Sequence, residues 1–189
     1  MKFSGAVLAG GQSSRFGQDK ARHVWQGKPL LSWVLESLAD ADECFVVANR
    51  TYSDFGLPTY ADVIAGSDSL SGIHSAVFHA RNDWVAVAAC DLPKLVPEYW
   101  RYLFAKIETD TQAVVGIGPG GFPEPLAAFY HCSLIPDIEH RLSRGELRLQ
   151  SLLVSAQTVV VPWAELEPRF GSGLYLNANR LEDLTSPYP

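Results

Sequence analysis

The sequence predicts an α/β fold in which a mostly parallel sheet lies between two layers of helices, a three-layer sandwich. Short apolar runs alternate along the chain with stretches whose apolar residues recur at helical spacing, and this alternation is typical of parallel sheets. The run at residues 84–90 is almost continuously apolar, as expected for a strand that is buried on both faces. A smaller β excursion is expected around residues 112–130.

The individual elements follow from apolar periodicity and from the Gly and Pro residues between them. Strands are predicted at residues 3–8, 44–48, 58–60, 84–90, 112–117, 125–130 and 159–161. Helices are predicted at residues 30–38, 97–107, 133–143 and 147–154, and in a stretch through residue 80 that Ser71 could cap. Pro29 suits the first turn of the first of these helices.

Composition limits the domain organisation and the classes of partner. The 189-residue chain contains 47% hydrophobic and 19% charged residues, which suits one compact domain with its own core. No repeat or linker interrupts the pattern, so residues 1–189 are expected to form a single domain. The formal net charge is -6, whereas general nucleic-acid and membrane-surface binders usually display a basic face. We therefore expect neither partner, although a local basic pocket is compatible with this charge.

The cysteines give no sign of a disulfide framework or a zinc site. Cys44, Cys90 and Cys132 are odd in number, widely separated and free of C-x-x-C spacing. We expect reduced, buried thiols, including Cys90, for which a nucleophilic role is the less favoured alternative. The N-terminal segment leads directly into a short apolar run, and no apolar run is long enough to span a membrane. A cytoplasmic protein is expected.

The loop after the first predicted strand has the composition of an anion-binding site. The strand ends at Gly10-Gly11, and glycines permit the sharp turn that lets backbone N–H groups converge on phosphate oxygens. Arg15 can form a bidentate fork with a phosphate, and Lys20 supplies a mobile point charge. These residues together could neutralise a polyphosphate.

Two familiar phosphate motifs do not account for this loop. A P-loop requires Gly-Lys followed by Ser or Thr, but Gly17 precedes Gln18 and Lys20 is followed by alanine. A dinucleotide fingerprint requires Gly-x-Gly-x-x-Gly at the start of a helix, and the glycine spacing here does not provide it.

Residues 8–20 instead resemble the nucleotidyltransferase signature Leu-Ala-Gly-Gly-x-Ser-x-Arg-Met-Gly-x-Asp-Lys, specifically that of the molybdenum cofactor guanylyltransferase family, with Phe16 at the methionine position. The alternative is an ordinary glycine-rich loop after a first strand. The resemblance implies a Rossmann-like sheet of the nucleotide-diphospho-sugar transferase type. It also implies that Leu8, Ala9, Gly10 and Gly11 contact the nucleotide through their backbone.

A second diagnostic stretch places a carboxylate at the end of the central strand. Asp91 follows the apolar run at residues 84–90, and such a carboxylate suits Mg²⁺, which prefers carboxylate, water and phosphate oxygens. The segment Cys90-Asp91-Leu92-Pro93 also resembles the Cys-Asp-x-Pro pattern of the same family. The alternative is a turn aspartate before Pro93.

Three further polar residues are candidates for the same site. Asp62 follows the third predicted strand and could accept hydrogen bonds from the imino and amino groups of a base; its alternative role is in a turn or a helix cap. Asn177 and Asn179 alternate along a predicted extended segment, so both amides could face the site. Capping of a following helix is the alternative for Asn179.

Besides Phe16, other positions depart from the family pattern. Val47 stands where some members have an asparagine, so any base contact made by that amide is absent. Asp68 and Ser69 depart from the usual Gly-Pro-Leu-Ala/Gly-Gly segment, whereas Leu70 and Gly72 agree with it. Glu124 replaces a glutamine, and a carboxylate near phosphates could repel them.

The resemblance implies transfer of GMP from GTP to the terminal phosphate of molybdenum-bearing molybdopterin, with release of pyrophosphate. In this reaction Arg15 would hold the polyphosphate, Lys20 would stabilise the α-phosphate and the leaving pyrophosphate, and Asp91 would hold Mg²⁺. Transient contacts with other cofactor-biosynthesis proteins or molybdoenzymes are also expected. The rival interpretations are a cytidylyltransferase for molybdopterin, a nucleotidyltransferase for another phosphorylated acceptor, and a nucleotide-binding regulatory module without turnover.

Overall fold

A computed structural model describes residues 1–10, 19–66 and 68–178. The strands are β1 (Ser4–Leu8), β2 (Val24–Trp25), β3 (Lys28–Pro29), β4 (Glu43–Val47), β5 (Thr59–Tyr60), β6 (Trp84–Ala89), β7 (Ala113–Ile117), β8 (Pro123–His131) and β9 (Thr158–Val161). The α-helices are α1 (Leu30–Ser37), α2 (Ser69–His79), α3 (Pro97–Phe104), α4 (Ile135–Ser143), α5 (Leu149–Ser155) and α6 (Trp163–Phe170). Short 3₁₀ helices lie at η1 (Lys20–Arg22), η2 (Ser53–Phe55) and η3 (Cys132–Leu134).

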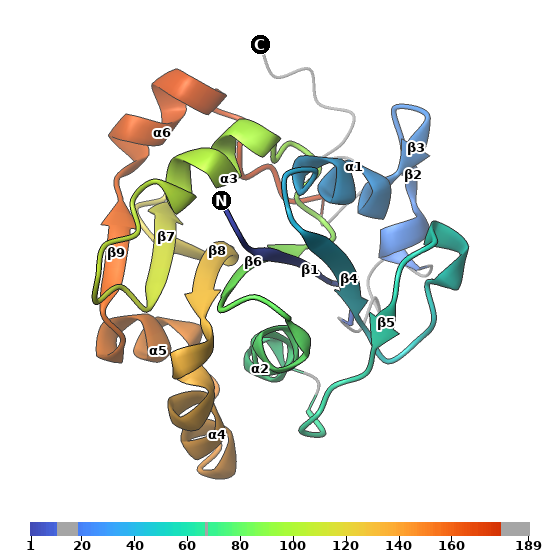
Figure 1. The fold of residues 1–189 in the computed structure, drawn as a ribbon. Helices are drawn as coiled ribbons and strands as arrows, with labels where there is room; N and C mark the ends of the chain where they lie inside the picture. The colour runs from blue at the N-terminus through green and yellow to red at the C-terminus, as the bar shows by residue number, and fades with distance from the viewer. Residues whose placement is uncertain (11–18, 67, 179–189) are drawn as a thin grey trace.

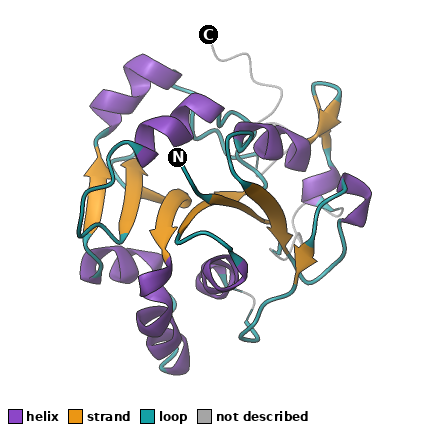
Figure 2. Cartoon of the chain, viewed as in Figure 1, coloured by secondary structure: helices purple, strands orange, loops and turns teal. Residues whose placement is uncertain are grey.

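The predicted three-layer α/β architecture is confirmed. A seven-stranded sheet has the order β5-β4-β1-β6-β8-β7-β9, and β8 alone runs antiparallel to its two neighbours. Helices α1, α3 and α6 cover one face of this sheet, and α2, α4 and α5 cover the other (Figure 1). Figure 2 shows the sheet enclosed by the two helical layers. The small hairpin of β2 and β3 stands apart from the main sheet.

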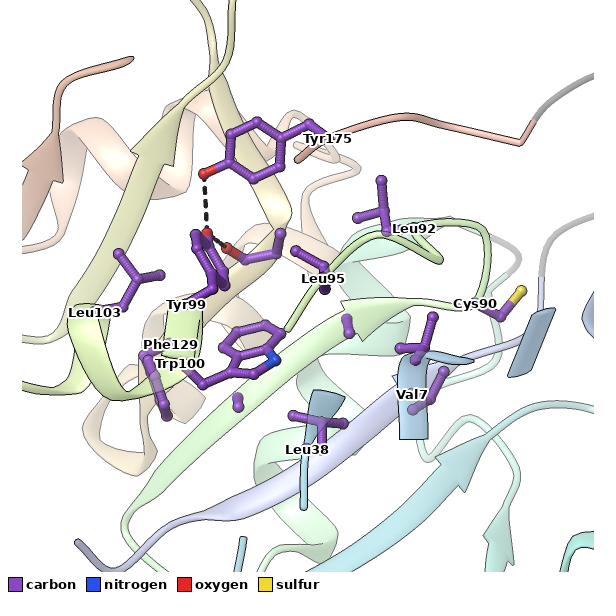
Figure 3. Close-up of a cluster of buried hydrophobic side chains, with 14 of the residues drawn as sticks. Val7, Leu38, Cys90, Leu92, Leu95, Tyr99, Trp100, Leu103, Phe129 and Tyr175 are labelled. Carbon is purple, nitrogen blue, oxygen red and sulfur yellow. Dashed lines mark hydrogen bonds between the residues drawn. The ribbon is translucent and has the colours of Figure 1, made fainter. Parts of the chain in front are cut away.

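The period-two geometry of the strands divides the interior into two cores, one on each side of the sheet. In β6, Ala86 and Ala88 face the core beneath α1, α3 and α6, whereas Val85 and Val87 face the core beneath α2, α4 and α5. Figure 3 shows part of the first core, where Trp100 of α3 packs edge-on against Phe129 with ring centroids 5.6 Å apart. Burial on both faces explains the continuous apolar run of β6.

The carboxyl ends of the central parallel strands meet at one edge of the sheet. Beyond the regular ladder, the Ala9 N–H donates to the Val47 carbonyl oxygen at 2.9 Å, and the Cys90 N–H donates to the Leu8 carbonyl oxygen at 3.1 Å. The chain therefore leaves β1, β4 and β6 at the same level, and the residues that follow these strands are brought together.

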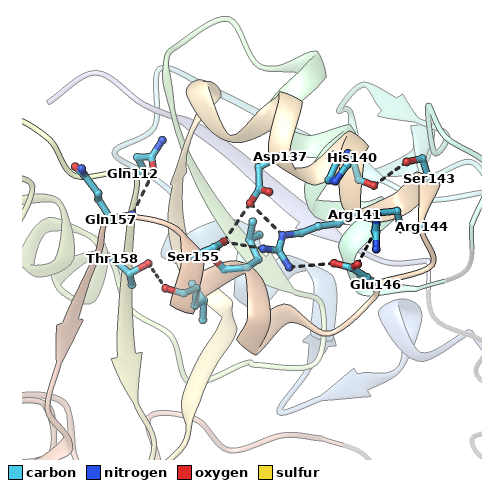
Figure 4. A network of polar contacts seen from close by, with 12 residues as sticks. Gln112, Asp137, His140, Arg141, Ser143, Arg144, Glu146, Ser155, Gln157 and Thr158 are labelled. Carbon is cyan, nitrogen blue, oxygen red and sulfur yellow. Dashed lines mark hydrogen bonds and ion pairs between the residues drawn. The ribbon is translucent and has the colours of Figure 1, made fainter.

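On the opposite side of the molecule, a polar network joins α4 to α5 (Figure 4). The Arg141 guanidinium donates to Asp137 at 3.0 Å and to the Ser155 hydroxyl at 2.8 Å. It also approaches Glu146 at 3.9 Å. The network fixes the two short helices relative to each other and lies away from the carboxyl edge of the central strands.

The structure corrects the predicted start of α2 and extends one strand. The helix begins at Ser69 and its N-cap is Asp68, whose carboxylate accepts from the Ser71 N–H at 3.0 Å. The predicted Ser71 cap is therefore wrong, because the longer acidic side chain three residues earlier satisfies that donor. Strand β8 begins at Pro123 rather than at residue 125, so Glu124 lies within it.

Helix α6 and the β2–β3 hairpin were not among the predicted elements.

Within residues 1–10, 19–66 and 68–178, no helix combines the length and apolar character needed to cross a membrane.

Candidate functional site

An ion pair between Lys20 and Asp91 lies at the carboxyl edge of the central strands. The Lys20 Nζ is 2.6 Å from Asp91 Oδ2, and the two side chains are only 15% and 16% exposed. The residues are 71 positions apart in the sequence. The ends of the first predicted loop and of the central strand, proposed from separate motifs, therefore meet in the folded chain.

The second carboxylate oxygen of Asp91 has the surroundings expected of a cation ligand. Asp91 Oδ1 is buried and has no hydrogen-bond partner among the described residues, and a buried anionic oxygen without a partner is costly. No group of three or more His, Cys, Asp or Glu side chains in the described part of the chain could enclose a metal. Mg²⁺ commonly uses one or two carboxylates together with phosphate and water oxygens, so a single carboxylate fits this ion.

Asp19 positions Lys20 through a set of contacts that the sequence did not reveal. Its carboxylate accepts from the Ala21 N–H at 3.2 Å, which caps η1, and from the Tyr52 hydroxyl at 2.9 Å. The Arg22 and Arg50 guanidinium groups approach its other oxygen at 3.3 and 3.6 Å. Burial raises the pKa of Tyr52, and the neighbouring Asp19 carboxylate adds to this effect. Tyr52 therefore stays a hydrogen-bond donor.

The described part of the anion loop is accessible at its glycine. Leu8 and Ala9 are partly buried, and Gly10 is exposed beyond the end of β1. A ligand could therefore approach the backbone here. The other two predicted loop residues, Gly11 and Arg15, lie outside the described residues.

Asp62 pairs with an asparagine that was not a predicted site residue. The Asn49 amide donates to Asp62 Oδ2 at 3.2 Å, and the Asp62 N–H donates to Asn49 Oδ1 at 3.4 Å. Burial raises the pKa of Asp62 and the Asp68 charge adds to that effect, whereas the Asn49 hydrogen bond opposes it. Asn49 could have been noticed as the first polar side chain after the second predicted strand. The Val47 side chain points into the core and is 2% exposed.

The C-terminal segment adjoins Asp91 through its backbone. The Ala178 N–H donates to the Asp91 carbonyl oxygen at 2.9 Å. This hydrogen bond brings the backbone next to the exposed Asn177 up to Asp91. Asn179 lies outside the described residues. Residues 176–178 form no regular strand, so a β-strand does not set the direction of the Asn177 side chain.

Glu124 lies near the same edge because β8 runs in the opposite direction to its neighbours. Ala127 pairs with Ala88, so the beginning of β8 is level with the residues that follow β6. The Glu124 carboxylate is half-buried and packs against Gly118. A Cβ added to this glycine would lie 2.4 Å from Glu124 Oε1. Burial raises the pKa of Glu124, which favours its neutral form relative to an exposed glutamate.

Cys90 is a buried thiol rather than a nucleophile. Burial, reinforced by the Asp91 charge, raises the pKa of Cys90 to about 12. Nucleophilic attack requires the thiolate, which is scarce at neutral pH under these conditions. All three cysteines are free of disulfides.

Comparison with known proteins shows which family the chain resembles. Residues 5–159 match the MobA-like NTP transferase domain family. A Deinococcus radiodurans protein described as a probable molybdenum cofactor guanylyltransferase is 36% identical over 185 residues, which cover 97% of this chain and 93% of the relative.

Solved structures agree with this assignment. Molybdopterin-guanine dinucleotide biosynthesis protein A from Archaeoglobus fulgidus matches with a TM-score of 0.81 and 28% identity, covering 97% of this chain and 95% of the other. A 2-C-methyl-D-erythritol 4-phosphate cytidylyltransferase from Thermus thermophilus shares the fold, with a TM-score of 0.69 and 18% identity over 97% and 96% of the two chains. The resemblance seen in residues 8–20 and 90–93 is thus confirmed, and the chain belongs to the MobA-like NTP transferase family.

Proposed function

We propose that this protein is a nucleotidyltransferase that transfers GMP from GTP to the terminal phosphate of molybdenum-bearing molybdopterin. The products are molybdopterin guanine dinucleotide cofactor and pyrophosphate. The observation that carries the proposal is the Lys20–Asp91 pair at the carboxyl edge of the sheet, in a chain whose relatives are described as molybdenum cofactor guanylyltransferases.

The reaction requires alignment and charge neutralisation more than proton transfer. An oxygen of the acceptor phosphate forms a bond to the α-phosphorus of GTP, and the bond from that phosphorus to the bridging oxygen breaks. The electron pair of the broken bond leaves with pyrophosphate. The attacking phosphate is already anionic, so no general base is needed, and the barrier arises largely from bringing negative groups together.

The Lys20 amine supplies a positive charge where this negative charge gathers. It pairs with Asp91 in the structure, and a triphosphate entering the site would compete for it. The flexible lysine side chain can follow the charge from the α-phosphate to the leaving pyrophosphate. Asp19 caps the turn that carries Lys20 and so limits the positions that the amine can reach.

We propose Mg²⁺ as the cofactor, held by Asp91 through the oxygen that has no partner among the described residues. When bound, this ion supplies charge neutralisation to the phosphate oxygens. Asp91 itself is fixed by its position after β6 and by the hydrogen bond from Ala178 to its carbonyl. The backbone that carries the carboxylate is therefore held in place, and the contact with Lys20 holds the carboxylate itself.

The nucleotide contacts are proposed from placement and family pattern together. Leu8, Ala9, Gly10 and Gly11 would contact the nucleotide through their backbone, and Arg15 would hold the polyphosphate. These five residues precede Lys20 in the signature.

The base and the C-terminal contacts form a second group. Asp62 would accept hydrogen bonds from the imino and amino groups of guanine, with Asn49 holding its carboxylate. Asn177 and Asn179 would complete the site near Asp91. We further propose that residues 1–189 act as a single domain in the cytoplasm, with transient contacts to other cofactor-biosynthesis proteins or to molybdoenzymes.

The direct test is pyrophosphate release with each of the four nucleoside triphosphates, with and without molybdopterin. We expect release only with GTP and molybdopterin together. A preference for CTP would replace guanylyl with cytidylyl transfer, and GTP use with another phosphorylated acceptor alone would change the acceptor. Binding without turnover under all conditions would indicate a regulatory module.

A further inference from the structure

An open cavity is lined by residues that follow Lys20 and Asp91 in the chain, and it belongs to none of the contacts assigned above. Its volume is about 690 Å³, within the roughly 300–1,000 Å³ range of small-molecule sites. The walls come from the β2–β3 hairpin, from α1, from the segment between β6 and α3, and from residues 170–173 after α6.

The chain connects this cavity directly to the ion pair. Trp25 in the hairpin follows Lys20 after η1, and Pro93 follows Asp91 after a single residue; both line the cavity. Asp62, by contrast, does not line the cavity. A nucleotide base at Asp62 and a ligand in the cavity would therefore occupy separate places.

Two tryptophans give the cavity an aromatic wall. The Trp25 and Trp33 ring centroids are 5.4 Å apart and the rings are tilted by 59°. The Trp33 indole N–H donates to the Trp25 carbonyl oxygen at 3.0 Å, and the Lys28 Nζ lies 3.5 Å from the centroid of the Trp33 ring. The Trp33 indole is thus fixed in place before a ligand binds, which lowers the entropic cost of packing a flat heterocycle against it.

A lysine supplies positive charge on another wall. Lys94 is partly buried and forms no ion pair with any residue in the described ranges. Its amine lies over Gly173, where an added Cβ would be 3.0 Å from Nζ. The glycine therefore leaves room for the amine at the cavity wall, where it can meet an anionic group.

We propose that this cavity binds the pterin end of the acceptor, with the heterocycle packed against Trp33 and the anionic groups attached to the pterin facing Lys94. This inference rests on the proposed function, because the terminal phosphate of the same acceptor must reach the Lys20–Asp91 pair. Glu36 also lines the cavity, but its carboxylate is paired with Lys28. The aromatic wall and Lys94 together therefore favour a ligand that combines a flat ring with anionic groups.

Binding can be tested without turnover, using neopterin monophosphate as a probe and no GTP. Isothermal titration should give saturable binding to the unaltered chain, weakened roughly tenfold in Trp33→Leu by loss of the aromatic wall. Lys94→Gln should bind this probe as the unaltered chain does, because the probe has no anionic group beside its pterin ring to meet Lys94. The matched control is Lys106→Gln, since Lys106 pairs with Glu165 and does not line the cavity.

Turnover with molybdopterin separates this inference from the proposed function. In Lys94→Gln and Trp33→Leu the KM for molybdopterin should rise roughly tenfold while the KM for GTP stays unchanged. An unchanged acceptor KM in both folded variants, or an equal loss for GTP, would overturn the cavity assignment and leave the transfer reaction intact. Absence of turnover in the unaltered chain would instead remove the proposed function. Failure of the unaltered chain to bind the probe at millimolar concentration would also overturn the cavity assignment.

Discussion

Removing the Lys20 charge should destabilise the protein, because it leaves the Asp91 carboxylate without a partner. Two unit charges 2.6 Å apart attract by about 6 kcal/mol at an effective dielectric constant near 20, and by about 2 kcal/mol in water. The two side chains are mostly buried but retain some exposure, so their attraction lies between these two energies. We expect Lys20→Met to lower the free energy of unfolding by about 2–3 kcal/mol, somewhat less than for a fully buried pair.

A second substitution should reverse the loss of stability without restoring activity. Asp91→Asn in the Lys20→Met background removes the unpaired charge and supplies amide hydrogens, so the free energy of unfolding should recover by about 1–2 kcal/mol. Turnover should stay at least about a hundredfold below normal in both single variants and in the double variant, since each lacks a group that acts on the phosphates.

The assay is urea unfolding at pH 7.5, followed by tryptophan fluorescence, alongside pyrophosphate release with GTP and molybdopterin. The control cycle uses Lys106→Met and Glu165→Gln, a pair whose side chains are 35% and 42% exposed and whose distance of 3.0 Å is similar. Its coupling should be within experimental error, because water screens it. A coupling for Lys20 and Asp91 no larger than that of the control, or a double variant that regains turnover, would refute the reasoning.

Three other predictions follow from the site. Asn49→Ala should reduce discrimination between GTP and ITP, which lacks the 2-amino group, by roughly tenfold, measured as the ratio of kcat/KM values; an unchanged ratio would exclude a role in base recognition. Glu124→Gln should raise stability at pH 7 but not below the unfolded pKa of 4.5. Burial raises the pKa of Glu124, so stability is lost as pH rises from 4.5 through the folded value, and thermal unfolding at pH 4 and pH 7 checks this. Chelation with EDTA should abolish turnover and added Mg²⁺ should restore it, except in Asp91→Asn; full activity in EDTA would contradict a metal at this carboxylate.

The central strands could be predicted closely because their burial leaves a direct mark on composition. The apolar run at 84–90 became β6 (Trp84–Ala89), and the run at 44–48 became β4 (Glu43–Val47). Both faces of these strands meet cores, so almost every residue must be apolar. The position of Asp91 followed from the same reasoning, since the first carboxylate after such a run lies at the sheet edge.

The missed elements depend on tertiary contacts rather than on local pattern. Helix α6 contains Pro168, which usually argues against a helix, and its hold on the fold comes from the buried Leu166 side chain. Strands β2 and β3 have two residues each, too few to show an alternating pattern.

The missed site contacts have the same origin. Asn49 and Asp62 are 13 residues apart, and Tyr52 and Asp19 are 33 residues apart. Which polar residues pair across such distances depends on strand order, and strand order was not predicted. From the sequence, only residues in a characteristic motif or next to a predicted strand could be proposed for the site.

The position of Glu124 in the fold acts on the charge of its carboxyl group in two opposite ways. The reversed direction of β8 brings this carboxyl group to the edge where the triphosphate would bind, and an ionised group there would repel it. Burial raises the pKa of Glu124, so the same position that brings the group close also favours its neutral form. A protonated carboxyl resembles the amide of glutamine in shape and can donate one hydrogen bond. Burial of Glu124 thus shifts this carboxyl toward protonation, so the strand that brings the charge to this edge also acts against it.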